Sequence, residues 1–422
     1  MRHRTGLDAD AGPDGSPEEH DGQDFPKNRS CGRLSLAVRL SIVFVFVVGC
    51  VYHIARVKKL RKGWRIDSQP KFYVYSGNGW IDWMSMRCNG SSLNEVVDPW
   101  VGKIPFKHTD DYWFVKAALA HPGRVSNPED ADLFVVPAML NFALEQMLWR
   151  KEQCCVGDIC NADLIIHTEM MLAQSPWFKR HGGKDHVIVC SHWACARTGI
   201  SKHNLDPFKN IQACNTVAFE ENSMRGDRCR IATTLVGRGC QDAPSEYGGS
   251  ATIDRNATVV MVASMHAERS KFQQRRDICK WAEHASHVIG SFTISRCGPG
   301  PQCPAVAQAR FGFHVRGDTL GSNRLIDYIL SGTVPIFTDE RQYDILPPFV
   351  PWRNMSFLID ASDEDEFVDA IGGIMQRYDA AKAVLDANAH LLHWATPVPF
   401  EKYMQLFERC SPRHRRRLGA PK

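Results

Sequence analysis

One stretch of the sequence, residues 311–337, constrains the fold more than any other. Residues 311–315 form a short apolar and aromatic run of the kind found in strands. A loop with two glycines follows, and then apolar residues recur at helical spacing as far as Gly332, which stands where a helix commonly ends. Residues 333–337 are β-branched and apolar, although Pro335 limits the hydrogen bonds such a strand can make. A strand, a helix and a second strand in this order predict an α/β fold with a mostly parallel sheet.

The loop in this stretch predicts a site for an anion. Backbone N–H groups of a glycine loop and of a helix start converge at the carboxyl end of a strand, where phosphate is the usual ligand. Arg324 stands in the first helical turn, where its planar fork can bind a pyrophosphate. Asp327 lies three residues later on the same face, where it can accept hydrogen bonds from two ribose hydroxyls. The alternative is an ion pair of Arg324 and Asp327 on the helix surface beside an ordinary turn, and the pattern leaves both interpretations open.

The remaining strand and helix patterns fall into two successive α/β halves. The first half has expected strands at 72–75, 133–136 and 187–190, and expected helices at 110–120, 138–151 and 163–175. In the second half we expect strands at 257–263 and 287–292, and helices at 268–282 and after residue 362. These patterns predict an N-terminal α/β domain at 71–250, a C-terminal α/β domain at 251–395, and a helix with a basic tail at 396–422. The cleft between the two domains is the expected ligand site.

The N-terminal residues predict a membrane anchor. Residues 1–33 are rich in Asp, Glu, Gly and Pro, which is typical of a disordered tail. Residues 34–55 are uncharged except for Arg39, and a helix of this length spans about 33 Å, enough to cross a bilayer. The run begins too far from residue 1 for a usual signal peptide, so we favour a retained anchor followed by a short stem at 56–70. A buried core helix is the alternative.

The orientation of this anchor is contested within the sequence. Basic residues after the span favour a cytosolic body by the positive-inside rule. Thirteen of the fifteen cysteines follow the span, as do the glycosylation sequons at Asn89, Asn256 and Asn354, and both features favour an oxidising lumen. We therefore expect a single-pass protein with a cytosolic N-terminus and a lumenal body. The net charge of +4 is too small to indicate a nucleic-acid partner.

Several segments together resemble the exostosin family of glycosyltransferases, glycosyltransferase family 47. Residues 127–137 (NPEDADLFVVP) resemble the family's motif of acidic residues, a strand and a proline, and residues 185–192 resemble its strand that ends near a histidine. Residues 317–336 and 346–352 resemble its glycine-loop and Leu-Pro-Phe motifs, and the likeness covers about residues 71–375. Departures such as Arg316, Thr333 and the extra proline in LPPF leave the donor sugar and the acceptor open.

The resemblance implies a Golgi type II membrane protein with two Rossmann-like halves of GT-B type that face each other across a cleft. It implies transfer of a sugar with inversion, from a nucleotide donor that is usually UDP-linked, to a glycan or glycoprotein acceptor. Homo- or hetero-oligomers with another glycosyltransferase are compatible with it. By motif position, the residues that it implies for nucleotide-sugar binding are Arg276 (beside Arg275), Gly317, Asp318, Ser322, Arg324 and Asp327.

Inverting transfer needs a base near the acceptor hydroxyl and positive charge for the departing diphosphate. The base is expected in the first half, where His192 at a strand end is the first candidate, followed by Asp110 and Asp111. A structural, hydrogen-bonded histidine is the alternative for His192. No essential metal site is expected, because Asp130 and Asp132 precede their strand instead of following it.

Other hypotheses remain beside the enzyme. Cys154, Cys155 and Cys160 could bind zinc with His167, although disulfides suit the lumen better, and an odd number of cysteines leaves at least one outside intrachain pairs. A sulfotransferase would need a phosphate loop of the form G-x-x-x-x-G-K-[ST], which the sequence lacks. A non-catalytic exostosin-like subunit would keep the fold and lose the nucleotide contacts, whereas this chain keeps Ser322, Arg324 and Asp327.

Overall fold

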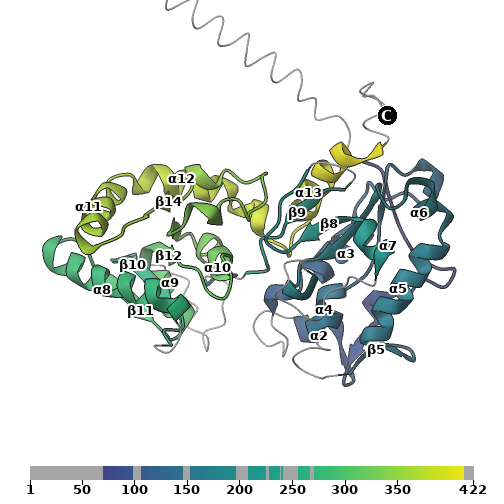
Figure 1. Cartoon of the computed structure of the whole chain (residues 1–422), viewed down its shortest axis with the longest axis horizontal. Coiled ribbons are helices and arrows are strands. Elements are labelled where there is room, and N and C mark those ends of the chain that lie inside the picture. The colour runs from purple at the N-terminus through teal and green to yellow at the C-terminus, as the bar shows by residue number, and fades with distance from the viewer. Residues whose placement is uncertain are drawn as a thin grey trace, which may run out of the picture. The chain divides into compact units, whose positions relative to one another are not determined.

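The computed structural model describes residues 70–97, 106–145, 153–195, 208–224, 228–237, 239–240, 255–266 and 270–412 (Figure 1). The predicted tail at 1–33, the predicted anchor at 34–55 and all of the predicted stem except Pro70 lie outside these residues. Within the described part of the chain, no helix combines the length and the apolar character that crossing a bilayer requires.

The first half of the described chain is built on a five-stranded parallel sheet. Its strands are β1 (Phe72–Val74), β4 (Leu133–Val135), β7 (His186–Cys190), β8 (Asn215–Ala218) and β9 (Arg230–Ala232), adjacent in that order. The strands are almost entirely buried, as expected of a parallel sheet that is covered on both faces. Its helices are α3 (Asp110–Ala120), α4 (Leu140–Glu145), α5 (Ala162–Gln174), α6 (Pro176–His181) and α7 (Lys209–Ala213).

The C-terminal helix α13 (Val398–Cys410) also belongs to this first half. It lies beside β8 and β9 in Figure 1 and packs on α3. Its aromatic residues Phe400, Tyr403 and Phe407 join the buried core formed by the strands. A disulfide between Cys229 and Cys410 ties the helix to the start of β9. The chain therefore returns to its first domain after it has completed the second.

A small antiparallel sheet accompanies the first half. It is formed by β2 (Arg87–Cys88), β3 (Ser91–Ser92), β5 (Cys154–Val156) and β6 (Ile159–Cys160), with the short helix α2 (Leu93–Val97) after β3. The segment from Cys154 to Cys160 is thus a hairpin. The disulfide Cys155–Cys160 joins the two strands of the hairpin, and Cys88–Cys154 joins the hairpin to β2.

A second parallel sheet forms the core of the second half. Its strands stand in the order β11 (Ile294–Gly298), β10 (Ala257–Val262), β12 (Ala309–His314), β13 (Val334–Phe337) and β14 (Phe357–Leu358). Its helices are α8 (Gln273–Val288), α9 (Gln302–Gln308), α10 (Arg324–Leu330), α11 (Glu364–Met375) and α12 (Tyr378–Asn388). Helices α8 and α11 pack side by side (Figure 1). Because β11 and β12 flank β10, the strand order reverses at β10, and such a switch point is where open α/β sheets bind ligands.

The stretch at 311–337 folds as its sequence predicts. Strand β12, helix α10 and strand β13 follow one another, and Gly332 ends the helix with a left-handed φ of 73°. Strand β13 pairs with β14 only from Ile336 onward, after Pro335, which lacks an N–H group to donate.

The strand expected at 287–292 is wrong. Helix α8 continues to Val288, and the strand begins only at Ile294. The buried residues Ala282 and Ala285 keep the helical period, while Val288 is 57% exposed at the helix end. The segment at 287–292 is therefore a helix terminus and a turn, which the hydrogen bond from the Phe292 N–H to the Ile289 carbonyl closes.

Six disulfides pair twelve of the thirteen cysteines that follow the predicted anchor. The remaining pairs are Cys190–Cys195, Cys240–Cys303 and Cys279–Cys297, and Cys214 is left free and buried. The prediction that at least one cysteine stays outside intrachain pairs is confirmed. The zinc alternative is wrong, because all three of its cysteines are in disulfides.

Candidate functional site

A pocket of about 850 Å³ lies at the switch point of the second sheet. The pocket is lined by Met261 to Ser264 at the end of β10 and by Phe313 to Val315 at the end of β12. It therefore opens at the carboxyl ends of these neighbouring strands. Residues of the first half line it as well. Its volume is in the range typical of small-molecule sites.

The glycine loop contributes one side of this pocket. Four of the residues predicted to bind the donor line it: Gly317, Asp318, Ser322 and Arg324. A hydrogen bond of 2.9 Å from the Gly317 N–H to the Thr319 carbonyl tightens the loop. The Nε atom of Arg324 donates to the carbonyl of Val262 at the end of β10. The side chain is thereby fixed at the switch point.

A second arginine, Arg275 at the start of α8, joins Arg324 in the pocket. Its Nε atom donates to the Arg316 carbonyl at 3.0 Å, and its Nη1 atom donates to the Ser264 carbonyl at 2.9 Å. Its guanidinium also lies over the Phe272 ring, 4.3 Å from the centroid. Burial lowers the pKa of Arg275 and the neighbouring charge of Arg324 lowers it further, while the carboxylate of Asp318 acts in the opposite direction. Two cations this close in a pocket favour an anionic ligand.

The structure places the other two predicted donor residues away from the pocket lining. Arg276 hydrogen-bonds the His266 carbonyl at 2.9 Å and the side chain of Gln273 at 2.6 Å. Asp327 is completely buried and accepts a hydrogen bond of 2.6 Å from Gln302. The alternative of an ion pair on the helix surface is wrong, because Asp327 does not lie on the surface. Sequence reasoning selected Arg276, whereas the neighbouring Arg275 is the arginine that faces the pocket.

The first half contributes a carboxylate to the pocket. Glu145, the last described residue of α4, lines it together with Lys107, His108 and Trp193. The Oε2 atom of Glu145 lies 3.1 Å from the Nε2 atom of His192, which is fully buried behind it. Sequence reasoning missed Glu145, because nothing in the pattern around residue 145 distinguishes it from other helix residues.

The tautomer of His192 follows from its second contact. The backbone N–H of Ala194 donates to the Nδ1 atom of His192 at 3.2 Å, so Nδ1 carries the lone pair. The proton of the neutral ring is then on Nε2, and this N–H group donates a hydrogen bond to Glu145. His192 has no free lone pair directed at the pocket, so the arrangement favours Glu145 as the proton acceptor and His192 as the residue that orients it.

A family model shows to which protein family the chain with this pocket belongs. The model of the Exostosin GT47 domain matches residues 67–371, which is well over half of the chain. The chain belongs to the exostosin GT47 family. It is therefore a member of a glycosyltransferase family, and the resemblance drawn from its motifs is confirmed.

Two solved structures show a weak likeness to this exostosin domain. The crystal structure of TarM is 9% identical with a TM-score of 0.31, and the match covers 60% of this chain and 61% of that one. A glycosyltransferase from Rickettsia africae ESF-5 is 9% identical with a TM-score of 0.34, over 72% of this chain and 95% of that one. Both TM-scores are too low to support any conclusion about the exostosin domain. No curated protein matches the chain.

The His108, Glu145 and His192 side chains lie close enough to suggest a metal site. Their candidate ligand atoms are within 4.8 Å of one another, and the Nδ1 atom of His108 is buried without a hydrogen-bond partner among the described residues. A neutral histidine that binds a metal through one nitrogen normally donates the proton on the other. The Nδ1 atom of His192 instead accepts a hydrogen bond from the Ala194 N–H, so metal binding at Nε2 would leave neither ring nitrogen with a proton. The cluster does not fit a metal ion.

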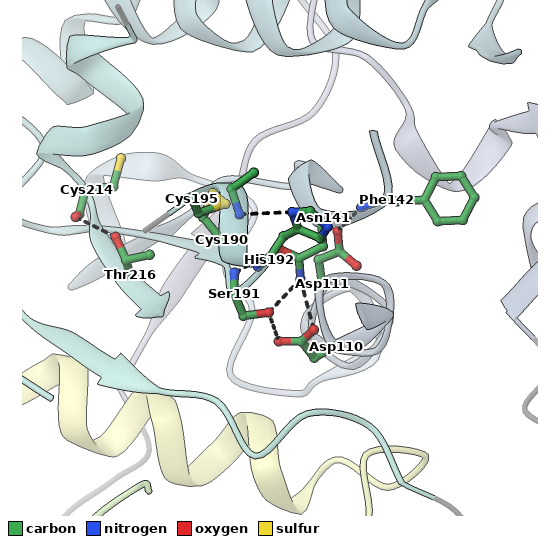
Figure 2. The surroundings of a disulfide bond; sticks show 11 residues. Asp110, Asp111, Asn141, Phe142, Cys190, Ser191, His192, Cys195, Cys214 and Thr216 are labelled. Atoms are coloured by element: carbon green, nitrogen blue, oxygen red, sulfur yellow. Dashed lines mark hydrogen bonds between the residues drawn. A yellow bond between two sulfur atoms is a disulfide. The ribbon is translucent and has the colours of Figure 1, made fainter. Parts of the chain in front are cut away.

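The structure places Asp110 and Asp111, the other base candidates, in the interior of the exostosin domain and not in the pocket lining (Figure 2). Asp110 accepts hydrogen bonds from Asn141 (2.9 Å), Ser191 (2.6 Å) and Thr233 (2.9 Å). Burial raises the pKa of Asp110 to about 6, although these hydrogen bonds oppose the shift. The geometry favours a structural role.

Asp111 has a similar environment. It accepts backbone N–H groups of Tyr112 at 2.8 Å and Phe142 at 3.2 Å, so it holds the start of α3 against α4. Burial raises the pKa of Asp111 well above its usual value, and the neighbouring charge of Asp110 raises it further. Both aspartates therefore connect elements of the fold behind the pocket.

The loop that carries His192 is fixed from two sides (Figure 2). The Oδ1 atom of Asn141 accepts the backbone N–H groups of Ser191 at 2.8 Å and His192 at 2.9 Å. The disulfide Cys190–Cys195 closes the same loop. These contacts determine where the His192 ring, and through it Glu145, can lie.

The three predicted glycosylation sites have the exposure that modification requires. Asn89, Asn256 and Asn354 are all exposed in the structure. Their modification remains a prediction.

Proposed function

We propose that this chain transfers a sugar from a UDP-linked nucleotide donor to a glycan or glycoprotein acceptor with inversion at the anomeric carbon. The observation that carries the proposal is the pocket at the switch point, where Arg275 and Arg324 lie among the lining residues. We further propose that the two parallel sheets form a GT-B architecture, with the donor on the side of the second sheet.

The diphosphate of the donor fits the two arginines. The hydrogen bonds described for their guanidinium groups go to the neutral backbone carbonyls of Arg316, Ser264 and Val262. The carboxylate of Asp318 offsets part of the charge at Arg275, while Arg324 adds a second positive charge beside it. Planar guanidinium groups bind phosphate oxygens in pairs and stabilise the charge that develops as the diphosphate departs. Helix α10 has only seven residues, so the arginines are a stronger support for this assignment than the helix dipole.

Glu145 supplies the base in this proposal. Its carboxylate removes the proton of the acceptor hydroxyl while that oxygen attacks the anomeric carbon and the bond to the departing UDP breaks. Attack from the side opposite the diphosphate inverts the configuration. The Nε2–H group of His192 donates a hydrogen bond to Glu145 and so holds the carboxylate in one orientation. No metal is needed for any of these steps, because the arginines neutralise the leaving group.

The proposed location is the Golgi lumen, with residues 34–55 as a type II anchor. Six disulfides support an oxidising compartment, and the exposure of Asn89, Asn256 and Asn354 is compatible with glycosylation there. The partners in this proposal are the Golgi membrane, the acceptor glycan and, for an oligomeric form, another glycosyltransferase.

Calorimetric titration of UDP into the full chain, purified in detergent, tests the donor assignment. We expect binding by the parent protein and at least about tenfold weaker binding by Arg324→Ala, since charge-assisted hydrogen bonds contribute about 1.5–3 kcal/mol each. A folded parent protein that binds no UDP would contradict the UDP form of the proposal and would favour a non-catalytic subunit. Incubation with UDP-sugars and an oligosaccharide mixture, followed by NMR of the new anomeric proton, would then test inversion.

A further inference from the structure

The glycine loop of the donor pocket is held by a carboxylate from the first half of the chain. Glu220 follows strand β8, and its Oε1 atom accepts hydrogen bonds from the Thr319 hydroxyl and from the Gly321 N–H, both at 2.7 Å. Burial raises the pKa of Glu220, and the bonds from Thr319, Gly321 and the backbone of Leu320 act in the opposite direction. The carboxylate is thus largely removed from water and bound to the loop instead.

Two local features indicate that this contact is specific. Glu220 has a φ of 47°, a left-handed conformation that is unfavourable for a residue with a side chain and that surrounding contacts must maintain. A Cβ atom at position 321 would lie 2.5 Å from the Glu220 Oε1 atom. Residue 321 must therefore be glycine for the carboxylate to reach the loop as it does.

The carboxylate holds the loop from outside the pocket. Gly317, Asp318, Thr319 and Gly321 all line the pocket, whereas Glu220 does not. Backbone N–H groups in such a loop attract anions. A fixed carboxylate that binds some of them orders the loop and leaves its pocket face to the ligand.

We propose that Glu220 is a positioning residue for the nucleotide donor, which keeps residues 317–321 in the conformation that the diphosphate requires. The inference rests on the proposed function and adds to it, because it assigns control of donor affinity to a residue of the other half of the chain. A loop that is ordered in advance binds its ligand more tightly, since less conformational freedom is lost on binding. Loss of the carboxylate weakens donor binding and leaves the chemical step unchanged.

The first test measures the loop without any ligand. Amide hydrogen exchange of the full chain, followed on peptides that cover residues 316–325, is expected to be at least about fivefold faster in Glu220→Ala than in the parent protein. Glu221→Ala is the matched control, because it removes the same charge one residue away, where the carboxylate binds Arg230 at 2.7 Å. Unchanged exchange in Glu220→Ala would overturn the proposal, and it would do so whether or not the protein binds UDP.

The second test measures the donor. Glu220→Ala is expected to weaken UDP binding and to raise the donor KM at least about fivefold, with kcat within about twofold of the parent value. Glu220→Gln keeps one acceptor oxygen, so it is expected to recover part of the lost affinity. Gly321→Ala, which displaces the carboxylate from the other side, is expected to have the same effect. Tighter binding in Glu220→Ala would show that the carboxylate competes with the nucleotide and would overturn the proposal. A parent protein with a protected loop and no affinity for UDP would refute the donor assignment while leaving the action of Glu220 on the loop intact.

Discussion

The Nε2 atom of His192 lies 3.1 Å from the Oε2 atom of Glu145, and the other ring nitrogen of His192 accepts the N–H of Ala194. This relationship assigns the two side chains different parts in proton transfer. The histidine is already a donor on one side and an acceptor on the other, while the carboxylate reaches the pocket. The strand-end histidine that the sequence favours as the base therefore acts, in our proposal, by orienting a glutamate.

Replacement of Glu145 by glutamine tests this division of roles. The amide keeps an oxygen that accepts the hydrogen bond from His192, but it is not a base. We therefore expect kcat to fall about 10²- to 10⁴-fold while UDP affinity stays within about threefold of the parent value. Turnover of a UDP-sugar by Glu145→Gln, beside calorimetric UDP binding, measures both quantities. Near-normal turnover in the variant would show that the base is another group.

The adjacent arginines 275 and 276 offer a matched pair. Arg275 lines the pocket and Arg276 does not, so Arg275→Ala is expected to weaken UDP binding about 10- to 100-fold and Arg276→Ala less than about threefold. Arg275→Lys keeps the charge but loses the planar fork, and we expect an intermediate affinity. Equal losses in the two alanine variants, measured by calorimetry, would contradict the assignment.

Asp110 predicts an unusual dependence of stability on pH. Its pKa is raised to about 6 in the folded chain from 3.8, so the folded state binds the proton more tightly than the unfolded state. The proton on Asp110 therefore adds its full contribution to the free energy of unfolding below about pH 4. This contribution is lost as the pH rises to about 6, which lowers the free energy of unfolding by about 3 kcal/mol in total.

Asp110→Asn is expected to remove the contribution of Asp110 to this dependence, while Asp111, whose pKa burial also raises, keeps its own contribution. The amide can donate to the Ser191 and Thr233 oxygens and accept from Asn141, so the variant should fold, keep its activity and show a flatter unfolding free energy between pH 4 and 6. Chemical denaturation of the parent protein and the variant at several pH values measures the effect. Asp110→Ala, which loses all three hydrogen bonds, is the comparison. An Asp110→Asn protein that is folded but inactive would restore Asp110 as a candidate base.

The general fold could be predicted because its signals are local. Helix α3 has the bounds predicted for it, 110–120, and β12, α10 and β13 follow the pattern of residues 311–337. The error at 287–292 is also local, because a short segment with a few apolar residues is compatible with a strand or with a helix end. Buried residues at 282 and 285 decide between them, and burial follows from packing against other elements.

The candidate site was predicted only where one segment contains it. The residues Gly317, Asp318, Ser322 and Arg324 belong to a single loop and helix start, and all line the pocket. Glu145 is 47 residues from His192, and Glu220 is 99 residues from Thr319, so neither pairing leaves a trace in local spacing. Arg275 could have been chosen over Arg276, since it lies three residues before the buried Ile278 and shares its helix face.

The disulfide between Cys190 and Cys195 predicts a selective effect on catalysis. It closes the short loop that carries His192, and the side chain of Asn141 holds the same loop through two backbone N–H groups. A double Cys190→Ala, Cys195→Ala variant loses one of these two constraints. From the loop length we expect a stability loss of about 2 kcal/mol, and a larger proportional loss of kcat than of UDP affinity, because the arginines of the pocket lie on other elements.

Turnover and calorimetric UDP binding in the variant separate the two effects. The control is a Cys155→Ala, Cys160→Ala variant, which opens a loop of equal length in the small antiparallel sheet. Equal losses of kcat in both variants would show that the Cys190–Cys195 disulfide only stabilises the fold.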